Sequence, residues 1–433
     1  MTDVPASPPT ASPPAFPPGD PDARTLLLTL TGLDRPGVTS VVFDALAPFS
    51  VEVLDVEQVV LRGRLVLGVL LTAPRDDTRL RKAIDSVAAD LEMEVEIRSG
   101  AGDNEPRRHG RSHVTVLGQP LSAKAVAAIA GRIADTGANI DRIIRIARYP
   151  VVAIELDVSG TDPDQLRSAL AVEAAAQYVD VAVQPSGLYR RAKRLVVLDV
   201  DSTLIQGEVI EMLAARAGCH EEVARLTAAA MHGDLDFAES LRQRVALLAG
   251  VDAGALSDVR REVVLTPGAR TLVRTLKRLG YQLGVVSGGF SQVVAPVAAE
   301  LGIDYTAANL LEVSDGRLTG RIVGPVLDRV GKAEALRRFA TRAGVPLSQT
   351  VAIGDGANDL DMLAAAGLGV AFNAKPVVRK AADTSVTVPY LDAILYLLGI
   401  TREEVESADA ESEAARTNEP GTSEPGTGSQ TSA

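Results

Sequence analysis

The chain has 433 residues, a net charge of −12 and a single cysteine, and these numbers exclude several kinds of protein. One cysteine cannot form an intramolecular disulfide, which fits a reducing compartment, so we expect a cytoplasmic protein. No apolar run is long enough to span a bilayer, and the N-terminus lacks the pattern of a secretory signal. A membrane is therefore not an expected partner, and because tryptophan is absent and aromatic residues are scarce, neither is a nucleic acid.

Both ends of the chain have the composition of disordered segments. Residues 1–22 are rich in Pro, Ala and Ser, and residues 401–433 are rich in Glu, Ser, Thr, Gly and Pro. Such segments cannot bury enough apolar surface to offset the entropy of the chain. Most of the negative charge lies in these two tails, so the acidity of the chain does not indicate a basic partner.

After the first tail, residues 23–99 alternate strand and helix patterns in the order of a βαββαβ unit. The strands are expected at 25–31, 51–61, 64–72 and 93–98, and the helices at 38–49 and 78–90. The run Gly32-Leu-Asp-Arg-Pro-Gly37 is expected to form the turn after the first strand. This order of elements predicts a ferredoxin-like domain.

A second unit of the same kind follows a linker, residues 100–111, that is rich in Gly, Asp, Asn and Arg. This unit covers residues 112–185. Its strands are expected at 113–117, 139–147, 151–158 and 179–183, and its helices at 122–136 and 163–176. The turn after its first strand is Gly118-Gln-Pro120.

The two units resemble tandem ACT domains, small modules that sense amino acids. In the first unit the resemblance is carried by Gly32-x-Asp-Arg-Pro-Gly37-Val, whereas the second unit has Gly118-Gln-Pro in its place. In that family, loops after the first strand contact amino acids across subunit interfaces. The resemblance therefore implies regulatory ligand sites at Gly37 and Gly118, serine as the effector, and a homodimer or higher homo-oligomer. A ferredoxin-like pair that only mediates dimerisation is the alternative that the fold leaves open.

Residues 186–400 have the pattern of an α/β domain with a doubly wound parallel sheet. Apolar strands, typical of the centre of a parallel sheet, are expected at 195–199, 283–287, 351–354, 369–372 and 385–388. Stretches between them, such as 269–279 and 292–301, have helical spacing. The helix-rich insertion at about 208–263 is predicted to form a cap that closes over an active site.

The first of these strands ends in two aspartates, Asp199 and Asp201, followed by Ser202 and Thr203. The carboxyl edge of a parallel sheet is where α/β folds bind ligands. There, Asp199 would attack phosphorus and Asp201 would protonate the leaving oxygen. Taken alone, however, this pair of aspartates favours an ordinary turn after a strand, because Asp-x-Asp is common.

Three later segments favour the catalytic interpretation. The second strand ends in Ser287-Gly288-Gly289, where a hydroxyl and backbone N–H groups would hold phosphate oxygens. Lys332 opens a helical stretch and would neutralise the phosphate and the attacking carboxylate. Asp355 and Asp359 follow the third strand.

Oxygen ligands for a metal ion are expected at the same edge of the sheet. Asp355 and Asp359 would complete a Mg²⁺ site with Asp199 and the backbone carbonyl of Asp201, because Mg²⁺ prefers hard oxygen ligands together with substrate phosphate. Each segment has an ordinary structural explanation alone, but all four in this order are not accidental.

The four segments resemble the haloacid dehalogenase-type phosphohydrolases, and specifically the phosphoserine phosphatase family, over about 195–400. Glu208 after the first motif, and the segment that contains Met231, Phe237 and Arg244, carry the closer resemblance. The substrate-binding set that the resemblance implies is Glu208, Met231, Phe237, Arg244, Ser287, Gly288, Lys332 and Asn358.

The chemistry of phosphoserine agrees with this set. Its carboxylate needs a cation and its ammonium an anion, which Arg244 and Glu208 would supply. Phe237 and Met231 would exclude water above the phosphate. Taken one at a time, these residues would be interpreted as a helix charge, a helix N-terminal carboxylate or core residues.

The resemblance implies an Mg²⁺-dependent enzyme that hydrolyses O-phospho-L-serine through an aspartyl phosphate, the last step of serine biosynthesis. Two alternatives remain. One is a phosphotransferase that passes phosphate from phosphoserine to another hydroxyl. The other is an amino-acid-responsive binding protein whose phosphatase domain is vestigial.

Overall fold

The computed structural model describes residues 23–102, 110–187, 190, 192–232 and 237–417. Contacts divide the chain into two compact units, 1–108 and 109–433. Residues 1–22, most of the predicted linker and residues 418–433 lie outside the described residues. Within the described ranges, no helix has the length and apolar character needed to cross a membrane.

The first unit is the predicted βαββαβ domain. Its elements are β1 (Arg24–Leu33), α1 (Val38–Leu46), β2 (Val53–Leu61), β3 (Arg64–Thr72), α2 (Thr78–Asp90) and β4 (Glu94–Ala101). The antiparallel sheet has the order β2-β3-β1-β4. Alternate residues of β1, Leu26 and Leu28 among them, are buried with α1 and α2 in one core, whereas Leu27 and Leu33 are exposed. The sheet therefore has one covered face and one open face.

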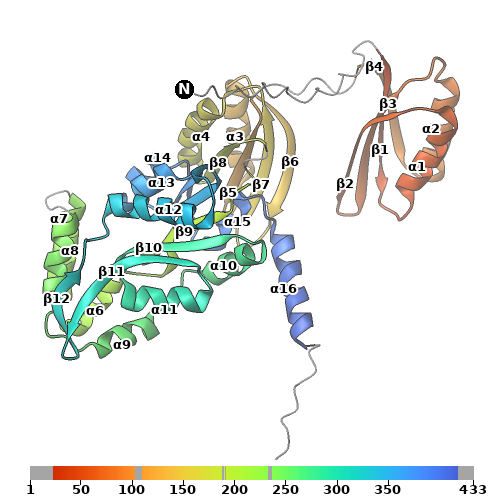
Figure 1. The fold of residues 1–433 in the computed structure, drawn as a ribbon. Helices are drawn as coiled ribbons and strands as arrows, with labels where there is room; N and C mark the ends of the chain where they lie inside the picture. Colours follow the sequence, from red (N-terminus) through yellow and green to blue (C-terminus); the bar gives the residue numbers. More distant parts are fainter. Residues whose placement is uncertain (1–22, 103–109, 188–189, 191, 233–236, 418–433) are drawn as a thin grey trace, which may run out of the picture. The chain divides into compact units, whose positions relative to one another are not determined.

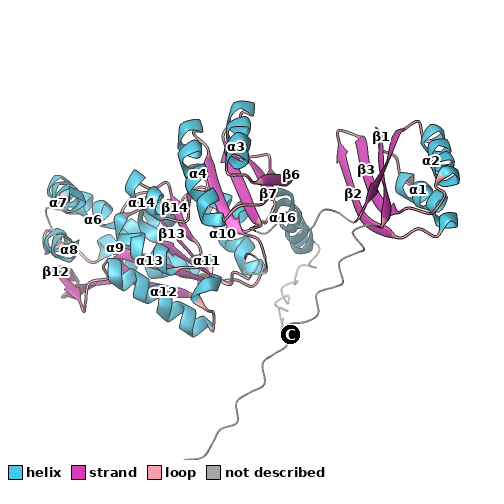
Figure 2. Ribbon diagram, turned by 90° about the horizontal axis from the view of Figure 1, so that it is seen from above, coloured by secondary structure: helices cyan, strands magenta, loops and turns pink. Residues whose placement is uncertain are grey.

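The second βαββαβ module begins the second unit. Its elements are β5 (Ser112–Gly118), α3 (Ala123–Asp135), β6 (Asn139–Ala147), β7 (Val152–Ser159), α4 (Pro163–Gln177) and β8 (Asp180–Pro185). Both helices begin at side-chain caps, since Ser122 accepts from the amide of Ala125 and Asp162 accepts from the first turn of α4. The strand order, β8-β5-β7-β6, is that of the first unit read from the other edge. Figure 2 shows α3 and α4 beside this sheet.

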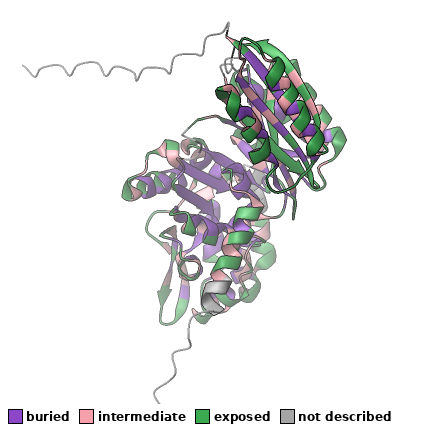
Figure 3. Ribbon diagram, turned by 90° about the vertical axis from the view of Figure 1, so that its right-hand side faces the viewer, coloured by how far each residue is buried: buried purple, intermediate pink, exposed green. Residues whose placement is uncertain are grey.

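The rest of the second unit contains the predicted parallel sheet. Its parallel strands are β9 (Leu195–Asp199), β10 (Gln282–Phe290), β13 (Thr350–Gly354), β14 (Gly369–Phe372) and β15 (Thr384–Val386). The helices around it are α10 (Ala269–Arg278), α11 (Ser291–Leu301), α12 (Arg329–Ala343), α13 (Leu360–Ala365), α14 (Pro376–Ala381) and α15 (Ile394–Leu397). Val196 and Leu198 pack with residues of α10 and α11, whereas Leu195 and Val197 pack with α12 and α13. The doubly wound α/β fold is confirmed, and Figure 3 shows its buried residues concentrated in the strands.

The structure adds a hairpin that the sequence patterns did not predict. β11 (Tyr305–Ser314) pairs with β10 in parallel, and β12 (Arg317–Val323) pairs with β11 in the antiparallel sense. The predicted cap consists of α6 (Val209–Ala217), α7 (His220–His232), α8 (Phe237–Ala246) and α9 (Gly254–Glu262). β12 packs against α8, so the hairpin extends the sheet to the cap.

The sequence divides residues 112–400 into two domains at 185, whereas the structure joins them in one eleven-stranded sheet. β8 meets β15 through the antiparallel pair Thr384 and Ala182. Next to it, the carboxylate of Asp180 accepts hydrogen bonds from the amide and the hydroxyl of Thr387 at 2.7 and 3.0 Å. A buried ion pair joins Arg190 to Glu155 of β7. The second ACT-like module is therefore part of the catalytic unit.

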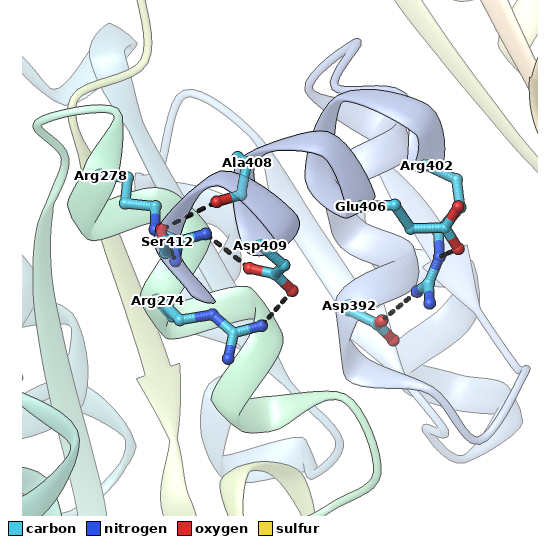
Figure 4. Close-up of polar contacts among 8 residues, drawn as sticks. All are labelled: Arg274, Arg278, Asp392, Arg402, Glu406, Ala408, Asp409 and Ser412. Carbon is cyan, nitrogen blue, oxygen red and sulfur yellow. Dashed lines mark hydrogen bonds and ion pairs between the residues drawn. The ribbon is translucent and has the colours of Figure 1, made fainter. Parts of the chain in front are cut away.

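Residues 402–417 form a helix, α16 (Arg402–Thr417), where the composition predicted a disordered tail from 401. Figure 4 shows how its charges are paired: Asp409 lies between Arg274 and Arg278 of α10. Val405 is buried in the main core. The disorder prediction is wrong for this segment, because the acidic residues have basic partners far away in the sequence.

Candidate active site

The first motif lies at the carboxyl end of β9, in the centre of the sheet. Asp199 is the last residue of the strand, and Asp201 follows in a short irregular turn, Val200–Leu204. One oxygen of Asp201 accepts from the amide of Val209 and the other from the hydroxyl of Ser287, both at 2.8 Å. The Asp201 carboxylate is therefore fixed between the start of the cap and the end of β10.

A buried lysine joins the first and last motifs. The Nζ of Lys332 lies 2.7 Å from Oδ1 of Asp199 and 2.7 Å from Oδ1 of Asp359. Burial acts to lower the pKa of Lys332, but the two carboxylates outweigh it and raise that pKa above its ordinary value. The ammonium therefore stays charged beside Asp199.

Three carboxylates form a group that fits a metal ion. Asp199, Asp355 and Asp359 each have an oxygen within 4.8 Å of the others. Burial and the charge of Asp359 raise the pKa of Asp199 well above its ordinary value, and the same two causes raise the pKa of Asp355 to about 6. Carboxylates held this close favour a bound cation, and their oxygens are hard ligands.

Glycines at the end of β10 allow the close packing of this site. A Cβ on Gly289 would lie 2.8 Å from Oδ2 of Asp201 and 2.9 Å from Oγ of Ser287, so a larger residue would displace both. The amide of Gly289 donates to the hydroxyl of Ser287, which itself donates to Asp201. Ser287, predicted to hold phosphate oxygens, thus also holds Asp201. Phe237 from α8 lies over Gly288, 3.3 Å from the position of a Cβ there.

A cavity of about 390 Å³ is lined by most of the predicted residues, while Ser287 and Asp359 lie behind its wall, in contact with Asp201 and Lys332. The core contributes Asp199, Asp201, Gly288, Lys332, Asp355 and Asn358, and the cap contributes Glu208, Phe237 and Arg244. Met231 belongs to α7, but its side chain lies outside the described part of the structure.

The cap end of the cavity carries the buried guanidinium of Arg244 and the half-buried carboxyl group of Glu208. Arg244 is only 5% exposed, and its guanidinium donates to Oγ1 of Thr227 and to the carbonyl of Ser240, both at 3.3 Å. Burial, and then the charge of Asp201, raise the pKa of Glu208 to about 7, although Arg244 acts to lower it. A guanidinium from α8 and a carboxyl group from the residue before α6 thus face the same cavity.

Comparisons with known proteins agree with this site. Residues 196–364 match the haloacid dehalogenase-like hydrolase family, and residues 24–98 and 111–184 each match an ACT domain family. A phosphoserine phosphatase of Streptomyces coelicolor is 65% identical over 390 residues, covering 90% of this chain and 95% of the relative. The chain belongs to the phosphoserine phosphatase family.

Two further members of this family extend the comparison. Phosphoserine phosphatase SerB2 of Mycobacterium tuberculosis is 54% identical over 89% of this chain and 96% of its own. A solved structure of a probable phosphoserine phosphatase from Vibrio cholerae is 33% identical, covers 69% of this chain and 88% of its own, and has a TM-score of 0.54. The fold and the two ACT domains thus agree with the resemblance seen in the sequence.

Two polar residues, Asn309 and Thr203, hold the site together in ways that the sequence did not predict. Asn309 of β11 donates to the carbonyl of Gly288 and accepts from the amide of Leu327, so it ties the end of β10 to the segment before Lys332. Thr203 donates to Asp355 at 3.1 Å. Thr203 belongs to the first motif, which could have indicated its role, whereas Asn309 has no such signal.

The two glycines that were predicted to contact a regulatory ligand have different surroundings. Gly37 caps α1 with φ of 93° and lines a surface cavity of about 470 Å³ with Asp34, Thr39 and Gln58. Gly118 ends β5, and a Cβ there would lie 3.0 Å from the Cα of Leu121. Close packing of its own loop therefore accounts for glycine at 118 without a ligand.

Proposed function

We propose that this protein hydrolyses O-phospho-L-serine to L-serine and phosphate, the last step of serine biosynthesis. The observation that carries the proposal is the arrangement of charge in one cavity. Asp199, Asp201 and Lys332 line its core end, and Glu208 and Arg244 line its cap end. A substrate with a phosphate at one end and an amino-acid zwitterion at the other matches this arrangement.

The first half of the reaction transfers the phosphoryl group to the enzyme. The Asp199 carboxylate attacks phosphorus, the bond between phosphorus and the serine oxygen breaks, and Asp201 gives that oxygen a proton. Lys332, charged and 2.7 Å from Asp199, offsets the negative charge that collects there. The hydroxyl of Ser287 and the amide of Val209 keep Asp201 oriented toward the leaving oxygen.

The second half regenerates the enzyme. Asp201, now ionised, takes a proton from a water molecule that attacks phosphorus. The bond between phosphorus and the Asp199 oxygen breaks, and inorganic phosphate leaves. Phe237, packed over Gly288, covers the phosphoryl end from the cap and would limit the access of bulk water to it.

Mg²⁺ is the metal that we propose for the carboxylate group. Asp199, Asp355 and Asp359 supply oxygen donors within one small volume, and the backbone carbonyl of Asp201 is the further ligand that we propose. When bound, Mg²⁺ would offset the charge of the phosphoryl group.

At the cap end, we propose that Arg244 pairs with the substrate carboxylate and Glu208 with its ammonium. The guanidinium forms no ion pair with a carboxylate among the described residues, so its charge is available to a ligand. Asn358, Gly288 and Met231 complete the proposed substrate set from the ends of β13 and β10 and from α7.

Regulation by serine through the first ACT domain is a further part of the proposal. The cavity at Gly37 supports a small ligand there, and the open apolar face of the first sheet, with Leu27, Val59 and Val66 exposed, supports a homo-oligomer. A lone cysteine fits a cytoplasmic location.

A panel of phosphate esters tests the function. Release of phosphate would be measured from phosphoserine, phosphoethanolamine and 3-phosphoglycerate, with Mg²⁺ or with EDTA. We expect the highest kcat/KM with phosphoserine, loss of activity in EDTA, and serine and phosphate in equal amounts even with other hydroxyl acceptors present. Preference for another ester would overturn the substrate, and a phosphorylated acceptor would favour the phosphotransferase.

Removal of residues 1–108 tests the regulation, because it takes away one whole unit. A cut at 185 would instead break the sheet between β8 and β15 and leave Arg190 without Glu155. We expect serine inhibition that excess phosphoserine does not overcome in the full chain, and only competitive inhibition after the deletion. An identical response in both proteins would exclude a role for the first ACT domain.

A further inference from the structure

The arginine at the cap end of the cavity depends on a threonine of the neighbouring helix. Thr227 lies on α7, is 9% exposed and lines the cavity together with Arg244 of α8. Its Oγ1 accepts a hydrogen bond from Nη1 of Arg244 at 3.3 Å. The same hydroxyl donates to the carbonyl of Val223 at 3.0 Å.

These two hydrogen bonds give the threonine oxygen one orientation. A hydroxyl has a single proton, and that of Thr227 is committed to Val223. The oxygen therefore presents a lone pair to the guanidinium, which can only donate. A second hydrogen bond between the helices, from the Ser240 hydroxyl to the Leu226 carbonyl at 3.2 Å, fixes α7 against α8 one residue away.

We propose that Thr227 is a positioning residue that sets selectivity for substrates with a carboxylate. It acts through Arg244, by holding the plane of the guanidinium so that its remaining N–H groups face the substrate carboxylate. Paired N–H donors recognise a carboxylate only when the two planes are aligned. The proposal rests on the proposed function and adds a residue that has no charge and no motif.

The test compares two substrates that differ only in the carboxylate. Phosphoserine has it, and phosphoethanolamine keeps the phosphate and the ammonium without it. Thr227→Val keeps the shape but removes the hydroxyl, and we expect KM for phosphoserine to rise about tenfold while kcat changes less than twofold. KM for phosphoethanolamine should stay within twofold of wild type. Thr227→Ser, the matched control, should restore KM for phosphoserine to within twofold.

A double variant tests whether the effect passes through Arg244. In an Arg244→Ala background, Thr227→Val should cause no further rise in KM for phosphoserine, because the effects of substitutions at two residues that act as one unit do not add. Three results would make Thr227 a packing residue and overturn the proposal. They are equal losses on both substrates, an additive effect in the double variant, and failure of Thr227→Ser to restore the KM for phosphoserine. If Thr227→Val does not fold, as judged by a thermal melt, Thr227→Ala replaces it with the same expected KM split.

The same measurements distinguish a failure of the proposed function from a failure of the role proposed for Thr227. If the wild-type protein does not prefer phosphoserine to phosphoethanolamine, the substrate assignment and the role of Thr227 both fall. If the wild type has that preference and Thr227→Val keeps it unchanged, only the positioning role falls.

Discussion

The two ends of the catalytic cavity are built from different kinds of structure. The core end is formed where parallel strands stop, and its groups hold one another, as Lys332 holds Asp199 and Asp359. The cap end is formed by side chains of α6, α7 and α8, where Glu208 and Arg244 face the cavity. In the proposed function the chemical step belongs to the core end and the choice of substrate to the cap end, so changes at the two ends should affect different kinetic constants.

The largest effect is expected from Asp199→Asn, at the core end. An amide is neither an adequate nucleophile nor an anionic metal ligand, so kcat should fall at least about 1000-fold for every phosphate ester. Steady-state release of phosphate measures it, with a thermal melt to show that the variant folds. Turnover near wild type would place the nucleophile elsewhere.

A smaller and selective effect is expected from Arg244→Ala, at the cap end. Loss of a charged hydrogen-bonded contact costs about 1.5–3 kcal/mol, so KM for phosphoserine should rise about 10- to 100-fold. KM for phosphoethanolamine should hardly change. The matched control is Arg242→Ala on the same helix, whose side chain is 59% exposed and pairs with Glu239. Equal losses on both substrates would mean that Arg244 does not contact the carboxylate.

At the cap end, KM for phosphoserine should depend on pH because of Glu208. Burial raises its pKa to about 7, so the carboxyl is ionised above that pH and neutral below it. KM for phosphoserine should therefore rise as the pH falls from 8 to 6, because the ammonium loses its anionic partner. Glu208→Gln should have a raised KM that no longer changes in this way.

The control for this pH profile is a substrate without an ammonium. The phosphate of 3-phosphoglycerate titrates in the same range, so it corrects for ionisation of the substrate itself. If the profiles of phosphoserine and 3-phosphoglycerate coincide in the wild type, Glu208 does not recognise the ammonium.

The smallest effect is expected far from both ends, at Asp409 of α16. Asp409→Ala removes the partner of Arg274 and Arg278, which are partly exposed, so we expect a loss of about 1 kcal/mol in stability. The melting temperature should fall by about 1–2 °C, with kcat and KM unchanged for both substrates. A changed KM would show that α16 also influences the cavity.

The core end could be predicted from the sequence, and much of the cap end could not. Side chains that follow parallel strands meet at one edge, so the strand ends at Asp199, Ser287 and Asp355 were enough to bring these residues together. Thr227 has no comparable signal, because its role depends on how α7 packs against α8.

Sequence patterns also could not predict how the modules are arranged. The union of the second ACT domain with the catalytic sheet rests on one strand pair and on contacts such as that of Asp180 with Thr387, 207 residues apart. The helix at 402–417 was missed for a similar reason, since its acidic composition predicts disorder unless Arg274 and Arg278 are known to lie beside it.

The most direct test of the account is to trap the phosphorylated enzyme. Wild-type protein with Mg²⁺ would be mixed with phosphoserine, quenched in acid within one turnover and analysed by peptide mass spectrometry. The account predicts one phosphoryl group on Asp199, which disappears as free phosphate forms and is absent with Asp199→Asn. Full turnover without modification of Asp199, or with the phosphoryl group on another residue, would contradict the account.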